Sequence, residues 1–344
     1  MKVLITGSRG YVGNRLCELL NKKYKDNIEI TGLDSNLYQS KKKIEKKFIN
    51  KDIRDVKIQD FREIEAVIHL ASLSNDPLGS LNESLTKDIN HKATTKIAKL
   101  SKKMNVKRFI FVSTQSVYGI SKYKNKTIRE NDENINPITE YAKSKFKAEK
   151  DILRLANDNF CVVILRPSTV HGPSENFRSD IVLNNLSGSA FTKKKIIINT
   201  NGKPFRPVLF IDDLCAIIIS CLFKQTKILQ KKIYNVGYPG KNFSILQIAT
   251  MVKKVFNKCP VIVLNNPSHD ERSYKVNFKL LSNDFSDVID FKNKNILDDI
   301  KKLKYFFKKK KFSLKDFTSE KTNRIFKIKT LLKTKKINKN LKFI

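Results

Sequence analysis

Residues 2–13 read KVLITGSRGYVG and constrain the fold of this 344-residue chain more than any other segment. The mainly apolar and β-branched residues Lys2–Thr6 predict a strand, and an apolar periodicity predicts a helix over Tyr11–Lys22. Of the three glycines between them, the first permits a tight turn, the second lets the backbone approach a pyrophosphate, and the third lets helix and strand pack closely. Phosphates would rest on the N-terminal end of the helix, where free N–H groups favour negative charge. The simpler alternative is a plain strand-to-helix turn. The loop residues expected to bind a dinucleotide are Gly7, Arg9, Gly10, Tyr11, Val12 and Gly13.

Outward from this loop, short apolar strands alternate with helical periods. The strands are rich in β-branched residues and apolar on both faces, which predicts a parallel sheet covered on both sides. We therefore expect an α/β fold built on a doubly wound, Rossmann-type parallel sheet. Strands are predicted at Ile28–Leu33, Ala66–Leu70, Arg108–Ser113 and Val162–Arg166, and helices at Asn90–Met104 and from Tyr141 onward.

Beyond residue 167 prolines become frequent and the predicted elements shorter, with amphipathic helices at Asp213–Phe223 and Ser244–Phe256. This change predicts a dinucleotide-binding domain over residues 1–167, onto which residues 207–235 pack back. Residues 168–206 and 236–305 would form a smaller, interleaved α/β lobe that binds the substrate. Residues 306–344 would form a basic tail.

Composition excludes several classes of protein. A content of 40% hydrophobic and 30% charged residues is ordinary for a globular chain. No segment approaches the roughly 20 apolar residues of a membrane span, and the N-terminus lacks a signal-peptide pattern, so we expect a cytoplasmic protein. The five cysteines and four histidines show no metal-ligand spacing. We expect buried, reduced cysteines and no metal site.

The net charge of +36 permits two interpretations. Clustered lysines suggest a nucleic-acid partner, whereas a general abundance of lysine needs no partner. The local excess lies in residues 301–344, where seventeen Lys and Arg face only Asp316 and Glu320, a net charge of 17 − 2 = +15. We expect a solvated or frayed tail there, with contact to an anionic membrane or RNA as the alternative, and we do not expect nucleic acid as a partner.

Asp34 closes the second predicted strand, 21 residues beyond Gly13. A carboxylate at this position can accept both ribose hydroxyls of NAD and repel a 2′-phosphate. Because no arginine stands directly beside it, NAD is favoured over NADP. Further cofactor contacts are expected at neighbouring strand ends, from Asp52 and Ile53 to the adenine and from Leu70, Ala71 and Ser72 to the nicotinamide ribose.

Tyr141 and Lys145 are four residues apart at the start of a predicted helix, so their side chains share one face. An ammonium group beside a phenol favours the phenolate, which creates a general acid/base usable near neutral pH. Thr114, just after the fourth strand, supplies a hydroxyl for the same substrate oxygen. We therefore predict Thr114, Tyr141 and Lys145 as the catalytic residues.

Four longer motifs accompany these residues: HLAS at 69–72, STQSVYG at 113–119, RPSTVHGP at 166–173 and RPVLFIDDL at 206–214. With the glycine loop and the Tyr141–Lys145 pair, they make the sequence resemble the extended short-chain dehydrogenase/reductase family, in its NAD-dependent nucleotide-sugar epimerase/dehydratase branch. The resemblance covers residues 1–305.

The resemblance implies an NAD cofactor and a nucleoside-diphosphate sugar substrate. Tyr141 would take a proton from a sugar hydroxyl, commonly at C4, as hydride leaves to the nicotinamide, and Lys145 would also hold the nicotinamide ribose. Asn90 matches an asparagine of the family, and we include it among the predicted cofactor contacts. Its alternative role is structural, as support for a helix cap or a helix kink. The family also implies a homodimer formed through helices Asn90–Met104 and Tyr141–Asn157.

Departures from the family pattern narrow the reaction. Similar sugar 4,6-dehydratases carry an Asp–Glu pair directly after the catalytic threonine, where this chain has Gln115 and Ser116. Neither side chain is an adequate acid at neutral pH, so dehydration is disfavoured. Many sugar 4-epimerases have asparagine at the position of Thr169 and tyrosine at that of His171. Ordinary UDP-glucose/galactose specificity is therefore in doubt.

The resemblance also suggests substrate contacts. Arg206 resembles an arginine that clamps the diphosphate, and Arg272 one near the nucleotide ribose. Arg178 and Asp180 could select the sugar, the loop Ser74–Gly79 would face it, and His171 either touches substrate or packs. The predicted substrate contacts are Gln115, Ser116, Thr169, His171, Arg178, Arg206 and Arg272.

The leading hypothesis is an NAD-dependent nucleotide-sugar epimerase that oxidises its substrate transiently, at C4. The first alternative is an NDP-4-keto-sugar reductase or NDP-sugar 4-dehydrogenase of the same fold. A 4,6-dehydratase and a dinucleotide-binding, RNA-associated scaffold rank below these. The intact Tyr141–Lys145 pair argues against the scaffold, since a binding module has no need of it.

Overall fold

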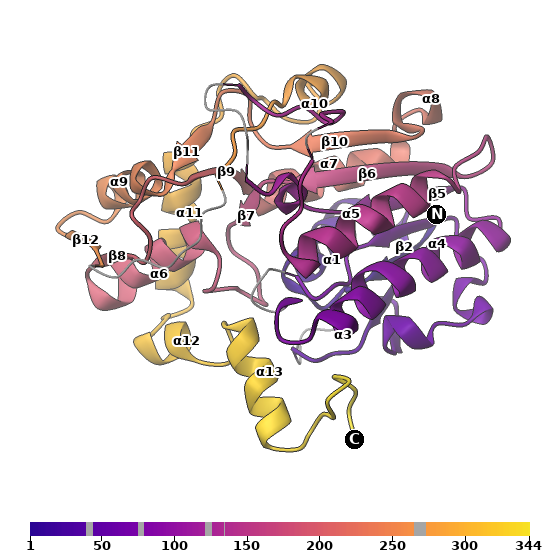
Figure 1. Cartoon of the computed structure of the whole chain (residues 1–344), viewed down its shortest axis with the longest axis horizontal. Coiled ribbons are helices and arrows are strands. Elements are labelled where there is room, and N and C mark those ends of the chain that lie inside the picture. The colour runs from indigo at the N-terminus through magenta and orange to yellow at the C-terminus, as the bar shows by residue number, and fades with distance from the viewer. Residues whose placement is uncertain (39–43, 75–78, 121–125, 134, 265–272) are drawn as a thin grey trace.

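A large parallel sheet forms the centre of the molecule (Figure 1). The computed structural model describes residues 1–38, 44–74, 79–120, 126–133, 135–264 and 273–344. Seven strands lie in the order β10-β6-β5-β4-β1-β2-β3, and every neighbouring pair is parallel. They are β1 (Lys2–Thr6), β2 (Glu29–Asp34), β3 (Lys47–Asn50), β4 (Ala66–His69), β5 (Arg108–Val112), β6 (Cys161–Pro167) and β10 (Lys232–Val236). The predicted Rossmann-type fold is confirmed.

The order of the strands reverses at β1, which pairs with β2 on one side and β4 on the other. Chain connections therefore leave the carboxyl ends of β1 and β4 in opposite directions and open a crevice between them, the usual ligand position in open α/β sheets. Val3 illustrates the register, since it lies opposite both Ile30 and Ala66.

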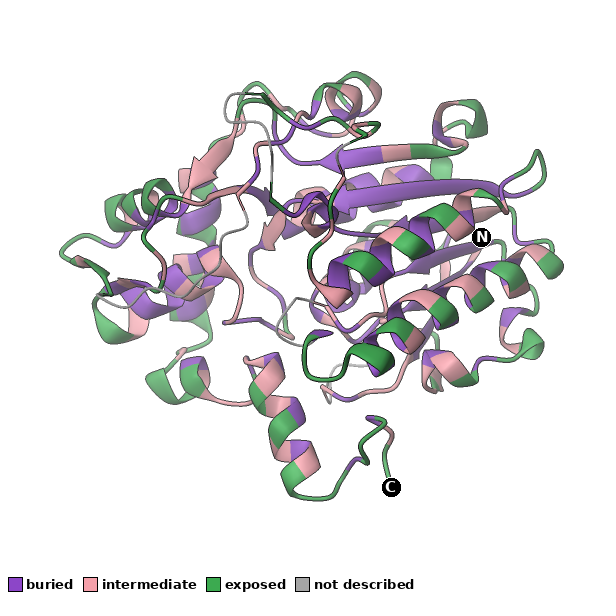
Figure 2. Ribbon diagram, in the orientation of Figure 1, coloured by how far each residue is buried: buried purple, intermediate pink, exposed green. Residues whose placement is uncertain are grey.

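Helices cover both faces of this sheet. Helices α1 (Tyr11–Tyr24) and α7 (Ile211–Phe223) pack on one face, and α4 (Thr94–Lys103) and α5 (Glu140–Leu153) on the other. The inner strands β1, β2, β4, β5 and β6 are almost wholly buried (Figure 2), as their two-sided apolar sequence predicts, whereas the edge strand β3 is partly exposed. All five cysteines are buried and unpaired, as expected.

Short helical segments connect these layers. A single-turn π-helix, η3 (Asp88–Ala93), precedes α4 in the predicted helix Asn90–Met104. The others are the 3₁₀ turns η1 (Ile53–Asp55), η2 (Ile58–Phe61) and η4 (Gln115–Tyr118), and the helices α3 (Glu83–Lys87), α8 (Thr226–Leu229) and α10 (Lys279–Asp284).

A smaller lobe stands at the carboxyl ends of the strands. It contains a three-stranded sheet, a two-stranded sheet and three helices that share one apolar core with α1 and α7. Its elements are β7 (Thr169–His171), β8 (Ile196–Ile198), β9 (Phe205–Phe210), β11 (Asn242–Ser244), β12 (Val261–Val263), α6 (Val182–Lys193), α9 (Ile245–Val255) and α11 (Ile296–Lys309). Between β9 and β11 the chain returns to the large sheet through α7 and β10.

The basic C-terminus is folded, so the expectation of a solvated or frayed tail is wrong. It contains α12 (Leu314–Thr318) and α13 (Arg324–Lys333), and the Asn323 side chain caps α13 by accepting a hydrogen bond from the Phe326 N–H. Ile328, Leu331 and Leu341 are buried in the same core as α4 and α5. Many lysines between the apolar residues obscure their helical spacing in the sequence.

Among the described residues, no helix has both the length and the apolar composition required to cross a bilayer.

Candidate active site

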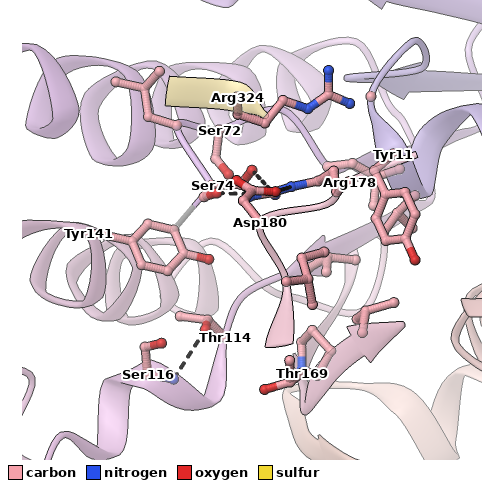
Figure 3. A pocket seen from close by; sticks show the side chains of 18 of the residues that line it. Tyr11, Ser72, Ser74, Thr114, Ser116, Tyr141, Thr169, Arg178, Asp180 and Arg324 are labelled. Atoms are coloured by element: carbon pink, nitrogen blue, oxygen red, sulfur yellow. Dashed lines mark hydrogen bonds and ion pairs between the residues drawn. The ribbon is translucent and has the colours of Figure 1, made fainter. Parts of the chain in front are cut away.

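A cavity of about 620 Å³ lies at the carboxyl ends of the central strands, between the sheet and the smaller lobe. It brings together residues as far apart in the sequence as Gly7 and Leu341, and Figure 3 shows part of its lining. Of the predicted site residues, it is lined by Gly7, Gly10, Tyr11, Val12, Gly13, Asp34, Asp52, Ile53, Leu70, Ala71, Ser72, Thr114, Ser116, Tyr141, Lys145, Thr169, Arg178 and Arg206.

The loop Gly7–Gly13, called here the phosphate loop, has room only for hydrogen at Gly7 and Gly13. Gly7 has a φ of +72°, and a Cβ there would lie 2.8 Å from the Ala71 nitrogen. A Cβ on Gly13 would clash with the carbonyl oxygen of Gly7. Helix α1 begins at Tyr11, and its N-cap residue, Gly10, offers no side-chain cap. Its first N–H groups therefore remain for an anionic ligand, and the cradle fits the pyrophosphate of a dinucleotide.

Asp34 stands at the end of β2 beside this loop. Its carboxylate accepts hydrogen bonds from the Arg9 N–H (3.1 Å) and the Asn36 N–H (2.7 Å), which fix its orientation toward the cavity. Burial raises the pKa of Asp34, although these hydrogen bonds oppose the shift. The Arg9 side chain does not line the cavity, because its guanidinium lies 3.3 Å above the centre of the Phe48 ring.

Asp52 and Ile53 border the cavity beyond Asp34. Asp52 accepts two hydrogen bonds from the Arg54 guanidinium, at 2.9 and 2.7 Å. Burial alone would raise the pKa of Asp52, but these hydrogen bonds lower it overall. On the other side, Leu70–Ser72 follow β4, and the Leu70 N–H donates to the Thr6 carbonyl at 3.1 Å.

Tyr141 and Lys145 lie in the first two turns of α5, which Thr139 caps by accepting a hydrogen bond from the Ala142 N–H. The Lys145 ammonium donates to the Val112 carbonyl at 2.9 Å, and burial lowers the pKa of Lys145 to about 7. A Cβ on Gly79 would lie 2.9 Å from the Cβ of Tyr141, so the chain before α3 packs tightly against Tyr141.

Thr114 and Ser116 lie below Tyr141 at the same end of the cavity (Figure 3). The Thr114 hydroxyl accepts a hydrogen bond from the Ser116 N–H at 3.1 Å, which starts the η4 turn. Gln115 points away from the cavity, and its amide nitrogen donates to the Arg166 carbonyl at 3.1 Å. The two positions after Thr114 therefore place no carboxylate beside the substrate space.

Arg178 and Asp180 reach the cavity from the smaller lobe. They form a bidentate ion pair with N···O distances of 2.9 and 2.8 Å, and Arg178 also donates to the Ser74 hydroxyl at 2.9 Å. Burial alone would lower the pKa of Arg178, but Asp180 raises it overall, with a smaller electrostatic contribution from Tyr141. The pair thus fixes a charged guanidinium near the phenol.

Arg206 and Thr169 line the substrate side of the cavity. The Arg206 guanidinium donates to the Phe205 carbonyl at 2.9 Å and lies 5.5 Å from the centre of the Tyr274 ring. Arg272 and the middle of the loop Ser74–Gly79, residues 75–78, lie outside the described residues.

Two further predicted site residues lie outside the cavity. Asn90 is fully buried and exchanges two hydrogen bonds with the backbone of Leu73, at 2.8 and 3.1 Å, within the π-helical turn that replaces the predicted helix start. This geometry agrees with the alternative structural role of Asn90. His171 is fully buried beside Phe210, with its Nε2 3.4 Å from Asp299. It packs there rather than facing the substrate space.

Tyr38, Arg324 and Leu341 are among the cavity-lining residues that the sequence did not indicate. The Arg324 guanidinium lies 3.8 Å above the centre of the Tyr38 ring. No local pattern distinguishes Arg324 from the many cations around it, because its position depends on contacts with residues far away in the sequence.

Comparisons with known proteins agree with this geometry. The model of the NAD dependent epimerase/dehydratase family matches residues 3–237. A putative UDP-glucose 4-epimerase of Methanocaldococcus jannaschii is 26% identical over 260 residues, which are 73% of this chain and 81% of that protein. A dTDP-D-glucose 4,6-dehydratase of Dictyostelium discoideum is 29% identical over 283 residues, which are 74% of this chain but only 62% of that protein.

A solved structure of UDP-glucose 4-epimerase from Thermotoga maritima with UDP-glucose has a TM-score of 0.77 at 20% identity, and the match covers 90% of this chain and 99% of that one. At this identity the similarity concerns the fold. The family match confirms the resemblance that the motifs indicated, and it confirms that the family depends on NAD.

Proposed function

Because the chain belongs to the NAD-dependent epimerase/dehydratase family, we propose that it is a nucleotide-sugar epimerase that oxidises its substrate transiently at C4. One observation carries the proposal: Thr114, Tyr141 and Lys145 line the same cavity as the phosphate loop. A proton acceptor, a hydroxyl donor and a dinucleotide cradle can therefore act on one substrate.

The cofactor would lie along the carboxyl edge of the sheet. The phosphate loop would hold the pyrophosphate, Asp34 the adenosine ribose, and Asp52 and Ile53 the adenine. Leu70, Ala71 and Ser72 would border the nicotinamide ribose, which Lys145 would also contact. NAD, when bound, supplies a hydride acceptor. Two partly buried hydrogen bonds hold the Asp34 carboxylate in place, which suits it to pair with ribose hydroxyls.

Tyr141 would remove the proton from the sugar hydroxyl, and Thr114 would hydrogen-bond the same oxygen. The positive N-terminal end of α5 and the Arg178 guanidinium favour the phenolate that this step requires. On return of the hydride, Tyr141 would give the proton back to the oxygen of the inverted centre. The substrate diphosphate would be held by Arg206, and the sugar by Thr169, Ser116 and Arg178.

The surroundings of Thr114 favour epimerisation over dehydration. Expulsion of water across C5–C6 needs an acid and a base beside the sugar. Gln115 faces the Arg166 carbonyl, Ser116 has no acidic group, and the Asp180 carboxylate is engaged by Arg178. The family contains dehydratases as well as epimerases, and these contacts support the epimerase side of the proposal.

The proposal includes a homodimer formed through the neighbouring helices α4 and α5. These helices pack side by side on one face of the sheet. Sedimentation equilibrium tests it: a dimer that dissociates when charges are introduced on the exposed side of α5 agrees with it, and a monomeric native protein contradicts it.

A panel of nucleotide sugars incubated with the purified protein tests the reaction, with liquid chromatography and mass spectrometry of the products. Epimerisation gives a product of unchanged mass and shifted retention, without added NAD(H). A gain or loss of two hydrogens supports the reductase or dehydrogenase alternative. Loss of one water contradicts the interpretation of Gln115 and Ser116. Tyr141→Phe protein is the control for each product.

A further inference from the structure

The C-terminal segment, defined here as residues 319–344, reaches the cavity from outside the part of the chain that the family model matches. That match ends at residue 237, yet Arg324 and Leu341 line the cavity together with Asp34 and Ile53. Figure 3 shows Arg324 next to Arg178 and Asp180 on the same wall. The segment therefore contributes to a site whose other components are far away in the sequence.

Arg324 is held rigidly but is not neutralised. Its side chain is only 3% exposed, stacks on Tyr38 and donates one hydrogen bond to the Asn176 carbonyl at 3.1 Å. The carboxylates of Asp34 and Asp180 act on it through space, without a hydrogen bond to it. Burial lowers the pKa of Arg324 to about 10, which reflects the cost of a desolvated cation. Among the described residues Arg324 donates this one side-chain hydrogen bond, which uses one of the five N–H donors of a guanidinium.

The end of the segment is fastened where the adenine would lie. Lys342 forms an ion pair with Asp55 at 2.8 Å, and the Arg54 guanidinium donates to the Asn340 carbonyl at 2.6 Å. Leu341, between these two attachments, turns its buried side chain into the core that contains Ile53. An apolar wall thus stands next to the proposed adenine position, while Arg324 stands next to the proposed ribose position.

We propose that the C-terminal segment is part of the cofactor site, covering the adenosine half of NAD, with Arg324 as a cofactor-binding residue. The guanidinium would donate to the adenosine ribose or pyrophosphate oxygens, and Leu341 would contact the adenine. This inference rests on the placement of NAD given under the proposed function. Its consequence is that the cofactor remains bound between turnovers, as suits an enzyme that returns its hydride to the substrate.

Isothermal titration of the full-length protein with two probes separates the halves of the site. ADP-ribose reports on the adenosine half, and UDP reports on the substrate side. Arg324→Ala should lower the affinity for ADP-ribose and for NAD by about 10- to 100-fold, which is the loss expected for a charge-assisted contact. Binding of UDP should not change. Lys329→Ala is the matched control, because Lys329 is exposed on the same helix.

Arg324→Gln preserves most of the side-chain volume and takes the place of the alanine variant if the latter does not fold. Loss of ADP-ribose affinity in either folded variant, with UDP affinity and the Lys329 control intact, supports the inference. Unchanged ADP-ribose affinity in a folded variant overturns it, while the placement of NAD stands. If the unaltered protein binds neither NAD nor ADP-ribose, the proposed cofactor placement itself fails.

Discussion

The phosphate loop and the C-terminal segment face one cavity but are built in opposite ways. The loop depends on the absence of side chains, since a Cβ on Gly7 or Gly13 would collide with neighbouring backbone. The C-terminal segment depends on side chains whose partners are remote, such as Lys342, which pairs with Asp55 287 residues earlier. Local backbone requirements leave a pattern in the sequence, whereas long-range packing leaves very little.

The largest expected effect concerns the local motif. Tyr141→Phe removes the proton acceptor and should lower turnover by about 100- to 10,000-fold, the usual contribution of a general acid/base. Binding of ADP-ribose and UDP should be preserved. Progress curves with the substrate found in the panel give the rate. Tyr305→Phe is the control, because Tyr305 is 67% exposed on α11. Retained turnover in Tyr141→Phe would sink the mechanism.

The next prediction tests the long-range packing of the C-terminal segment. Ile328→Ala should reduce the free energy of unfolding by about 2–5 kcal/mol, since it deletes a fully buried side chain from the core. Lys329→Ala, on the exposed side of α13, should change it by no more than about 0.5 kcal/mol. Urea unfolding of both variants measures the difference. Equal, negligible effects would show that the segment does not pack as described.

Two glycines separate the structural role of the loop from its binding role. Gly13→Ala places a methyl group against the Gly7 carbonyl and should cost about 1–3 kcal/mol of stability, as overpacking commonly does. Gly10→Ala meets the same carbonyl at a looser 3.1 Å. Gly10→Ala should cost less stability than Gly13→Ala. It should weaken the binding of NAD, because its methyl group would take the place of the pyrophosphate. Thermal unfolding and NAD titration distinguish the two, and equal stabilities would contradict the packing argument.

The last effect is a pH dependence at Lys145, whose contribution to stability accumulates over several pH units. Its pKa is about 7 in the folded protein because of burial and 10.5 in a model compound. Between these values the unfolded chain binds a proton that the folded chain does not, so stability rises with pH by up to about 1.4 kcal/mol per unit. In Lys145→Met the free energy of unfolding should rise less steeply with pH between pH 7 and 10, because this contribution is absent. Identical slopes in denaturant titrations would show that Lys145 is not desolvated.

Much of the Rossmann-type sheet could be predicted from the sequence because each strand and helix carries its own periodicity. The predicted strand Lys2–Thr6 agrees with β1 at both ends, and the predicted strand Arg108–Ser113 with β5 to within one residue. The cavity also contains the glycines, Asp34 and the Tyr141–Lys145 pair that the motifs indicated.

The rest depends on packing that no local pattern encodes. Asn90 and His171 are polar residues within recognisable motifs, yet one fixes the Leu73 backbone and the other is buried beside Asp299. Arg9 stands in the phosphate loop but stacks on Phe48. The buried face of α13 is obscured by lysines whose long chains lie outside the core. Arg324 is therefore indistinguishable from surface cations until the structure places it.

Transfer of an isotope tests the central claim most directly. The nucleotide sugar selected by the panel is prepared with deuterium at C4 and converted to its product without added NAD(H). We predict slower turnover than with the unlabelled sugar and a product epimerised at C4 that keeps its deuterium, because the hydride leaves and returns to the same carbon inside one closed site. Deuterium found in released NADH, or absent from the product, would contradict the account.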